Sequence, residues 1–384
     1  MKICFICSEY PPGPHGGIGT VVQIVARELV KQNNAVRIIG VYAKDYLALD
    51  YEDDHGVKVW RLREQSGKFS WIPIWYKQYK IIKEWIKKKE IDIVEAPESR
   101  GWYAFWPKLP VPIVQRAHGL ETQVSEFLGN KPNKITKLLE YLSYKRADAY
   151  SAVSQYAADA AKKIFNLNKE HVVIYNGIEL INYDSAIDRV KNKIVFSGTL
   201  TEKKGVIQLI EAAKLLFKTH PDFILEINGK DSTDKTHGSM KNYLLTLIPQ
   251  ELNSKIIFRG HLERAELFRS YRSASVAVFP SFWETFGVAP IEAMMCGCPT
   301  IHSTIATGYE IIDNYVDGIL VDPHNPIAIS AAINKILNNQ ELANQLSVRA
   351  REKVKNLFSK EIMIKKLVDF YQGEIRKFTL KQSH

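Results

Sequence analysis

The chain has 384 residues, of which 46% are hydrophobic and 24% are charged, and its formal net charge is +10. This length predicts two domains of roughly 150–200 residues each, and the composition excludes wholesale disorder. No stretch reaches the ~18–20 uninterrupted apolar residues of a membrane-spanning helix. The basic charge predicts an anionic partner: a phosphorylated ligand, an acidic membrane surface or nucleic acid.

Nucleic acid is not the expected partner, because the sequence has no zinc-finger spacing, basic-leucine pattern or RNA-binding aromatic signature. The run 3–7 is too short for a signal peptide and lacks a small-residue cleavage site, so we interpret it as a buried first strand. We therefore expect a cytoplasmic protein, and peripheral binding at the inner face of the membrane stays an open alternative. Structural thiols are expected at Cys4, Cys7, Cys296 and Cys298.

Short apolar, β-branched runs recur along the chain and alternate with stretches of helical period. The first series of expected strands comprises 3–7, 35–42, 57–62, 91–96, 112–116, 148–153 and 172–175. The second series comprises 194–197, 223–228, 255–259, 276–280, 299–302 and 318–321. The helices expected between them include 20–32, 76–89, 206–219, 263–274 and 327–338. Nearly continuous apolar strands that alternate with helices predict an α/β fold with two doubly wound parallel sheets.

The polar stretch 181–193 shows no apolar period and marks the domain boundary. We therefore expect an N-terminal domain over 1–182 and a C-terminal domain over 183–359. A last helix, about 360–377, has no strand after it, so we expect residues 360–384 to pack back toward the N-terminal domain.

Two loops between a strand and a helix could receive an anion. Gly16-Gly17-Ile18-Gly19 precedes the first helix, where it makes either a tight turn or a backbone contact to a phosphate or sugar. In the second domain, Lys203 and Lys204 lie just before a helix N-terminus. A lysine there opposes the helix dipole by some tenths of a kcal/mol, which mildly favours a bound phosphate over two solvated side chains.

Two carboxylates, Glu284 and Glu292, flank the turn Phe286-Gly287 and are separated by seven residues. We expect the next helix to begin near Pro290, which places Glu284 in the loop and Glu292 in the first turn. Ligands of doubly wound sheets bind at the carboxyl ends of strands, where this segment lies. Both carboxylates can thus face one ligand; otherwise they stabilise a helix N-terminus at the surface.

Together these motifs resemble the retaining, GT-B-fold glycosyltransferases of family 4. Glu284 to Glu292 matches the E-x7-E signature, and Gly198 to Gly205 matches the G-R-L-x-x-x-K-G segment. Further matches are the glycine loop at Gly17, Ala117-His118-Gly119, Ala152-Val153-Ser154, Asn176-Gly177-Ile178 and Gly308-Tyr309-Glu310. The resemblance implies two Rossmann-like domains that face each other across a cleft, the N-terminal one binding the acceptor and the C-terminal one the nucleotide-sugar donor.

The resemblance also implies roles for individual residues. Glu292 would bind the ribose of a UDP- or GDP-linked donor, Glu284 the donor sugar, and His118 would lie beside the transferred sugar. The other donor-binding residues implied are Gly17, Gly198, Lys203, Lys204, Arg259, His261, Phe286, Gly287 and Val288. Candidates to meet the acceptor, from their place in loops at strand ends, are His15, Glu98 and Arg100. No cofactor or metal is expected, since lysines and loop amides can stabilise the leaving diphosphate, and Asp53-Asp54 is interpreted as a solvated turn.

One position departs from the family pattern. The usual arginine of the G-R-L segment is Thr199 here, and threonine cannot clamp a diphosphate bidentately. Either Lys203, Lys204 and another cation such as Arg259 replace it, or the leaving group is held less firmly.

The predicted function is transfer of a hexose or related sugar to a hydroxyl acceptor, a glycan or lipid-linked intermediate of cell-surface polysaccharide or glycolipid synthesis. The alternatives are a sugar-nucleotide 2-epimerase of the same fold and a non-catalytic nucleotide-sugar-binding scaffold.

The helix around 76–89 allows two interpretations. Apolar side chains recur at helical spacing, and the rest of its surface is rich in lysine. These apolar residues are Trp75, Tyr79, Ile82 and Ile86. We favour a helix that covers the sheet with its lysines in water, and docking on anionic lipid stays open.

Overall fold

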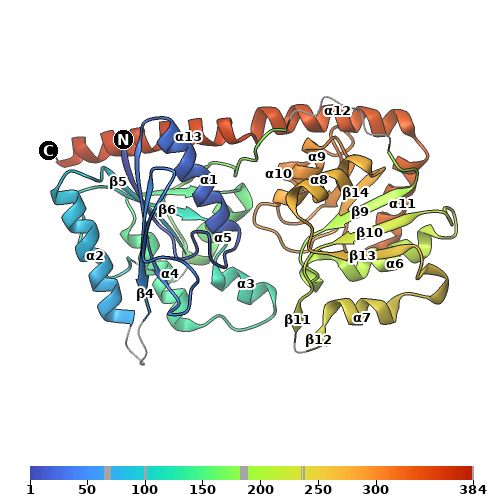
Figure 1. The fold of residues 1–384 in the computed structure, drawn as a ribbon, viewed down its shortest axis with the longest axis horizontal. Helices are drawn as coiled ribbons and strands as arrows, with labels where there is room; N and C mark the ends of the chain where they lie inside the picture. The colour runs from blue at the N-terminus through green and yellow to red at the C-terminus, as the bar shows by residue number, and fades with distance from the viewer. Residues whose placement is uncertain are drawn as a thin grey trace. The chain divides into compact units, whose positions relative to one another are not determined.

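The computed structural model describes residues 1–64, 71–98, 101, 103–181, 189–234, 236 and 238–382. The chain divides into two compact units, the first formed by Met1–Asn176 with Met363–His384 and the second by Gly177–Ile362. Each unit is an open, twisted sheet covered by helices on both faces (Figure 1). No helix in the described ranges has the length and apolar character needed to cross a membrane.

The first unit contains an eight-stranded sheet of order β3-β4-β2-β1-β5-β6-β7-β8, in which only β3 pairs antiparallel. Its strands are β1 (Lys2–Ile6), β2 (Ala35–Tyr42), β3 (Tyr51–Asp54), β4 (Val57–Arg63), β5 (Ile93–Pro97), β6 (Ile113–Ala117), β7 (Ala149–Ala152) and β8 (His171–Val173). Its helices are α1 (Gly17–Lys31), α2 (Trp71–Lys87), α3 (Glu121–Phe127), α4 (Lys134–Arg146), α5 (Gln155–Phe165) and most of α13 (Lys360–Gln382). Every residue of β5 and β6 is buried, as expected of central parallel strands covered on both faces.

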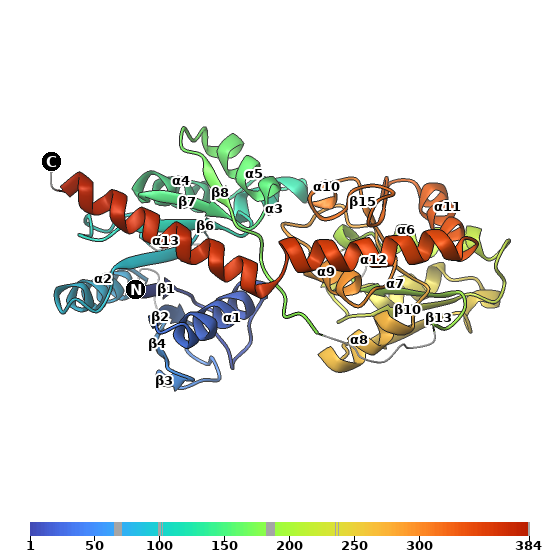
Figure 2. The same cartoon turned by 90° about the horizontal axis from the view of Figure 1, so that it is seen from above.

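Helix α13 completes the core of the first unit although it comes from the far end of the sequence (Figure 2). Its buried residues Ile364, Leu367 and Tyr371 pack in one apolar cluster with Phe5 and Leu29. The Tyr371 hydroxyl donates to Glu95 at 2.5 Å. The last helix therefore covers part of one face of the sheet in the first unit.

Helix α2 covers the sheet with its apolar side. Trp75, Tyr79, Ile82 and Trp85 are buried in a cluster with residues of the neighbouring strands. The lysines of this segment are exposed: Lys77, Lys80, Lys83, Lys87, Lys88 and Lys89. The expectation that this helix covers the sheet is confirmed.

The second unit contains a six-stranded parallel sheet of order β13-β10-β9-β14-β15-β16. Its strands are β9 (Lys193–Ser197), β10 (Ile224–Asn228), β13 (Ile256–Gly260), β14 (Val276–Phe279), β15 (Thr300–Ser303) and β16 (Ile319–Val321), with a small hairpin of β11 (Thr233–Asp234) and β12 (Gly238–Ser239). Its helices are α6 (Val206–Leu216), α7 (Met240–Leu247), α8 (Arg264–Ser273), α9 (Val288–Met295), α10 (Gly308–Ile311), α11 (Pro326–Leu337) and α12 (Gln340–Leu357). Strand order reverses between β9 and β14, and ligands of such sheets bind at this point.

Every strand expected from the sequence is present, with its bounds shifted by at most two residues. Strand β3 was not expected, and the interpretation of Asp54 as a solvated turn residue is wrong, whereas Asp53 is exposed as expected. Asp54 accepts hydrogen bonds from the Tyr10 hydroxyl at 2.6 Å and from Arg27 Nη2 at 2.6 Å. Strand β3 forms a polar hairpin with β4 at the edge of the sheet, and Tyr10 and Arg27, which are distant in sequence, hold it there through Asp54. The four cysteines are buried and free, as expected.

Candidate active site

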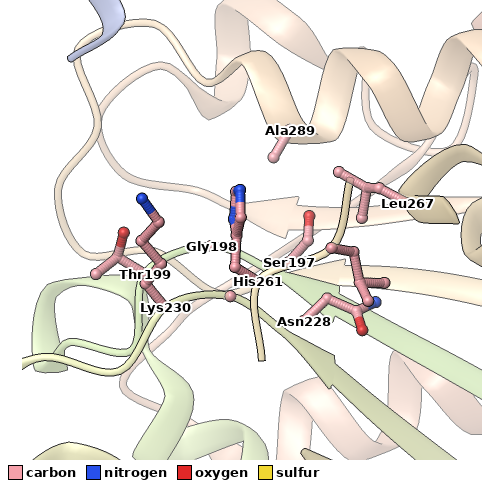
Figure 3. A pocket seen from close by; sticks show the side chains of 10 residues that line it. Ser197, Gly198, Thr199, Asn228, Lys230, His261, Leu267 and Ala289 are labelled. Carbon is pink, nitrogen blue, oxygen red and sulfur yellow. The ribbon is translucent and has the colours of Figure 1, made fainter. Parts of the chain in front are cut away.

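The site of the second unit begins where β9 and β10 end. A pocket of about 330 Å³ lies there, beside the first turn of α9 (Figure 3). Its lining consists of Ser197, Gly198, Thr199, Asn228, Gly229, Lys230, His261, Leu262, Leu267 and Ala289. Of the residues predicted to bind the donor, Gly198 and His261 are among them.

A tight turn holds the loop after β9 against the loop after β14. Gly205, at φ +70°, lies where a Cβ atom would collide with the carbonyl oxygen of Pro280, so no other residue fits without rearrangement. The Phe282 N–H donates to the Lys203 carbonyl at 2.8 Å. Sequence segments some eighty residues apart are thus fixed to each other by their backbones.

This backbone arrangement brings Lys204 and Glu284 together as an ion pair, with 21% of each side chain exposed. A Cβ atom placed on Gly198 would lie 3.9 Å from Lys204 Cδ, so the pair adjoins the pocket. The neighbouring Lys203 ammonium lies 5.0 Å from the centre of the Trp283 ring. Burial, together with the charge of Lys204, lowers the pKa of Lys203. Two ammonium groups held this close form a natural place for a polyanion.

Glu292 lies in the second turn of α9, because the helix begins at Val288 and not near Pro290 as expected. Gly287, at φ +90°, precedes the helix, and no acidic residue lies in its first turn. The positive end of the helix dipole is therefore left for a ligand. The Glu292 side chain is 15% exposed, and Arg264 Nε lies 3.9 Å from Oε1. Burial raises the pKa of Glu292 to about 7 although Arg264 opposes the shift.

Since the family resemblance implies that Glu292 binds the donor ribose, its raised pKa predicts that donor affinity depends on pH. An ionised carboxylate accepts hydrogen bonds from ribose hydroxyls more strongly than a neutral carboxyl does. With a pKa of about 7, the dissociation constant for a nucleotide sugar should therefore tighten about tenfold from pH 6 to pH 8. Calorimetric titration measures this change, and Glu292→Gln should remove it while leaving the titration of every other group in place.

Stability of the unliganded protein should change in the opposite direction. The pKa of Glu292 is about 7 in the folded state and 4.5 in the unfolded state, so between these pH values the folded state binds one more proton than the unfolded state. The free energy of unfolding is therefore highest below pH 4.5 and falls as the pH rises to about 7. Glu292→Gln should accordingly be more stable than the wild type at pH 8. A tightening of nucleotide binding with pH that is identical in wild type and Glu292→Gln would contradict the assignment.

Arg259, a predicted donor ligand, does not line the pocket beside Lys204. Its Nη1 atom lies 3.8 Å from Glu226 Oε2, and the side chain lines a second pocket of about 370 Å³. Glu226 also pairs with Lys193 at 2.9 Å. In this structure Arg259 is directed toward a neighbouring carboxylate rather than the position that Thr199 leaves open.

In the first unit, His118 follows the end of β6, and its loop is held by Glu98. The carboxylate of Glu98 accepts from the backbone N–H groups of His118, at 2.8 Å, and Gly119. Glu98 is fully buried, which raises its pKa to about 7. Burial and the charge of Arg116 lower the pKa of His118 to about 3, so its imidazole is neutral. Glu98 thus holds the His118 loop in place through these two backbone N–H groups.

The glycine loop before α1 already has an internal acceptor. The carboxylate of Glu9 accepts from the N–H groups of Gly16 at 3.1 Å and Gly19 at 2.8 Å. Gly17 is exposed, with open space where a Cβ atom would be. His15 is exposed and its Nδ1 lies 2.8 Å from the Gly13 carbonyl. The fifth candidate of this unit, Arg100, lies outside the described residues.

Sequence reasoning missed Glu9, Lys230 and Arg264. Glu9 and Lys230 both follow the carboxyl end of a predicted strand, which is the one signal that could have identified them. Arg264 begins the helix after β13, and only the packing of α8 beside α9 brings it to Glu292.

Comparison with known proteins decides the family. The profile described as "Glycosyltransferase Family 4" matches residues 15–181, and the profile described as "Glycosyl transferases group 1" matches residues 178–353. The chain belongs to glycosyltransferase family 4. Members are retaining enzymes that use nucleotide-sugar donors, so this protein is a glycosyltransferase, as predicted.

Alignments with related proteins cover nearly the whole chain. The uncharacterized glycosyltransferase MJ1607 of Methanocaldococcus jannaschii is 29% identical, with 97% of this chain and 98% of the relative aligned. Glycogen synthase of Mycobacterium tuberculosis is 24% identical, with 93% and 91% aligned.

Solved structures confirm the predicted GT-B fold. Sucrose-phosphate synthase of Thermosynechococcus elongatus superposes with a TM-score of 0.77 at 20% identity, covering 97% of this chain and 98% of its own. Anabaena Alr3699/HepE in complex with UDP and glucose gives a TM-score of 0.75 at 17% identity, covering 97% of this chain and 99% of its own.

Within the described ranges, no group of three or more His, Cys, Asp or Glu side chains is placed to hold a metal ion.

Proposed function

We propose that this family 4 enzyme transfers a hexose or related sugar from a UDP- or GDP-linked donor to a hydroxyl of a glycan or lipid-linked acceptor. The proposed setting is cell-surface polysaccharide or glycolipid synthesis. The observation that carries the proposal is the Lys204–Glu284 ion pair beside a pocket at the switch point of the sheet. A positive group for a diphosphate and a carboxylate for sugar hydroxyls lie next to each other there. The relative HepE, which shares the fold, is known in complex with UDP-glucose.

The donor-side roles are those that the family resemblance implies, and the pocket of the second unit supports them. The ribose binds Glu292, the base lies toward His261, and the diphosphate contacts Lys204, Lys203, Gly198 and the first turn of α9. The backbone N–H groups of Phe286, Gly287 and Val288 hold the sugar and the distal phosphate. Binding must exchange partners, because Lys204 and Glu284 neutralise each other in the unliganded structure. Lys204 then moves to the phosphate and Glu284 to a sugar hydroxyl.

The chemistry requires the bond between C1 and the phosphate oxygen to break, with both electrons leaving on the diphosphate. The Lys204 ammonium and the α9 dipole stabilise that negative charge without having to reorganise during the reaction. A lone pair of the acceptor oxygen forms the new bond to C1 on the face that the phosphate leaves. The acceptor proton passes to the departing phosphate oxygen.

The first unit is proposed to bind the acceptor. The neutral imidazole of His118 can accept or donate a hydrogen bond at the sugar, and Glu98 keeps its loop in place. His15, Gly17 and Arg100 remain proposed contacts to the substrates. A cytoplasmic place of action and contact with an anionic membrane belong to the same proposal, which the exposed lysines of α2 support.

Thermal unfolding with excess UDP, GDP or ADP tests the donor site. A nucleotide at 100 times its dissociation constant stabilises the protein by about 2.7 kcal/mol, which is a readable shift in Tm. We expect one nucleotide to raise the Tm of the wild type, Glu292→Ala to lose the response, and the exposed Glu251→Ala to keep it.

The outcomes separate the parts of the proposal. If no nucleotide shifts the wild type, the donor site is refuted. If Glu292→Ala responds like the wild type, the donor lies elsewhere. Release of the nucleotide from its sugar donor then separates a transferase from a protein that only binds, because a scaffold would bind without turnover.

A further inference from the structure

The pocket beside α9 contains a gap in its positive charge at Thr199. The side chain of Thr199 is exposed at the pocket and carries no charge. Arg259, which could have compensated, is directed to Glu226. A diphosphate in this position would still need a cation on the wall formed by the ends of β9 and β10.

Backbone pairing brings Lys230 to that wall. Strands β9 and β10 pair from Lys193↔Ile224 to Ser197↔Asn228, and the pairing continues past both strand ends. The Gly198 N–H donates to the Asn228 carbonyl at 2.9 Å, and the Leu200 N–H donates to the Lys230 carbonyl at 2.9 Å. Thr199 therefore lies between two bonded positions, next to Lys230. Figure 3 shows both side chains on the same side of the pocket.

Lys230 supplies a cation to this wall of the pocket. Within the ranges that the structure describes, its ammonium makes no ion pair or hydrogen bond. By contrast, Lys204 pairs with Glu284, and Arg264 has Glu292 within 3.9 Å. Lys230 is exposed and lines the pocket, so its charge is available to an anionic ligand there.

The rest of the pocket fits the same ligand. Gly198 and Gly229 have no side chains, and a Cβ atom on Gly229 would collide with the Gly198 carbonyl. This part of the pocket is therefore lined by backbone atoms alone. Opposite them, Ala289 lies in the first turn of α9, which contains no acidic residue. A lone ammonium, a bare backbone wall and a helix N-terminus together surround about 330 Å³.

We propose that Lys230 binds the diphosphate of the donor and replaces the arginine that Thr199 has displaced. This inference rests on the proposed function, since it places a further residue in the same donor site. Lysine acts as a point charge, whereas arginine clamps two oxygens in a fixed plane. The contact therefore comes from the end of β10 rather than from the end of β9, and the two positions are alternatives for one role.

Calorimetric titration of four proteins tests this exchange: the wild type, Lys230→Ala, Thr199→Arg and the double variant. The ligand is UDP or GDP, whichever binds the wild type. Loss of a charge-assisted hydrogen bond should weaken binding about 10- to 100-fold in Lys230→Ala. Thr199→Arg in the Lys230→Ala background should restore affinity to within about threefold of the wild type. The matched control is Lys218→Ala, which removes an exposed lysine beyond the end of α6.

The matching nucleoside, uridine or guanosine, supplies a second readout, because it lacks phosphate. Its affinity should be the same for the wild type and Lys230→Ala. Equal weakening of nucleoside and nucleotide would overturn the proposal, since Lys230 would then contact the base or ribose. An unchanged nucleotide affinity in Lys230→Ala, with Glu292→Ala still defective, would overturn it and leave the proposed function standing. A wild type that binds neither UDP nor GDP would instead refute the proposed donor site itself.

Discussion

Lys204→Ala should reduce kcat by about 100- to 1000-fold, the range found when one preorganised donor to a developing negative charge is removed. Lys204 lies between Gly198 and Glu284, where the charge on the departing diphosphate develops in the proposed reaction. Its contribution grows as the C1–O bond breaks, so KM for the donor should change less than kcat. The measurement is the rate of nucleotide release from the sugar donor, with water or a glycan pool as acceptor.

Two variants make this experiment specific. Lys204→Arg keeps the charge and should retain more activity than Lys204→Ala. Glu284→Gln removes the charge of the carboxylate proposed to bind a sugar hydroxyl and leaves only a neutral acceptor. Because this weakens binding of the donor sugar, Glu284→Gln should raise KM for the donor more than Lys204→Ala does. A Lys204→Ala enzyme with unchanged kcat would place the leaving group away from this pair.

Arg116→Met should destabilise the first unit by about 3–5 kcal/mol, because it removes two buried hydrogen bonds and the charge that favours the ionised form of the buried Glu95. Arg116 is 2% and Glu95 5% exposed. Arg116 Nη2 donates to the Ile174 carbonyl at 2.9 Å and to Asn176 Oδ1 at 3.2 Å. Burial raises the pKa of Glu95, and the charge of Arg116 limits that increase. Urea unfolding, with the transitions of the two units analysed separately, gives the loss.

The effect of Arg116→Met should depend on pH. Without Arg116 the pKa of Glu95 rises further, so the folded state takes up a proton and the defect is smaller at pH 5 than at pH 8. Adding Glu95→Gln should recover part of the lost stability, because no buried charge then remains. If the double variant is as unstable at pH 8 as Arg116→Met, the two residues do not interact through charge.

Most of the fold could be predicted from the sequence, because buried parallel strands are locally distinctive. All five residues of β5 and all five of β6 are buried, as expected of strands covered on both faces. The polar side chains among them, Glu95, Gln115 and Arg116, each make a hydrogen bond. Strand β3 could not be predicted in this way. Its Asp54 is stabilised by Tyr10 and Arg27, and no local pattern reports partners that are 44 and 27 residues away.

The site was predictable where the chemistry is local to one loop. The positions of Lys204, Glu284 and Glu292 follow from motifs that lie between a strand and a helix. Their pairing does not, since Lys204 and Glu284 meet only because Gly205 allows the two loops to touch.

Where a side chain points cannot be read from its residue type. Arg259 and His261 are two residues apart, yet Arg259 is directed to Glu226 and His261 lines the pocket beside α9. Arg259 lies in β13, and Gly260, at φ +70°, turns the backbone before His261. Likewise, the place of Glu98 in a loop at a strand end could be predicted, but its hydrogen bond to the His118 N–H depends on the tertiary fold.

The discontinuous first unit has a consequence for biosynthesis. Translation releases Met1–Asn176 first, but this segment lacks the part of α13 that carries Ile364, Leu367 and Tyr371. The continuous unit Gly177–Ile362 contains all of its own elements, so its core needs no residue from the other segments. The earlier-made half must wait with an apolar face and Glu95 uncovered until the last helix emerges. During that interval its uncovered apolar face is exposed to aggregation or to binding by a chaperone.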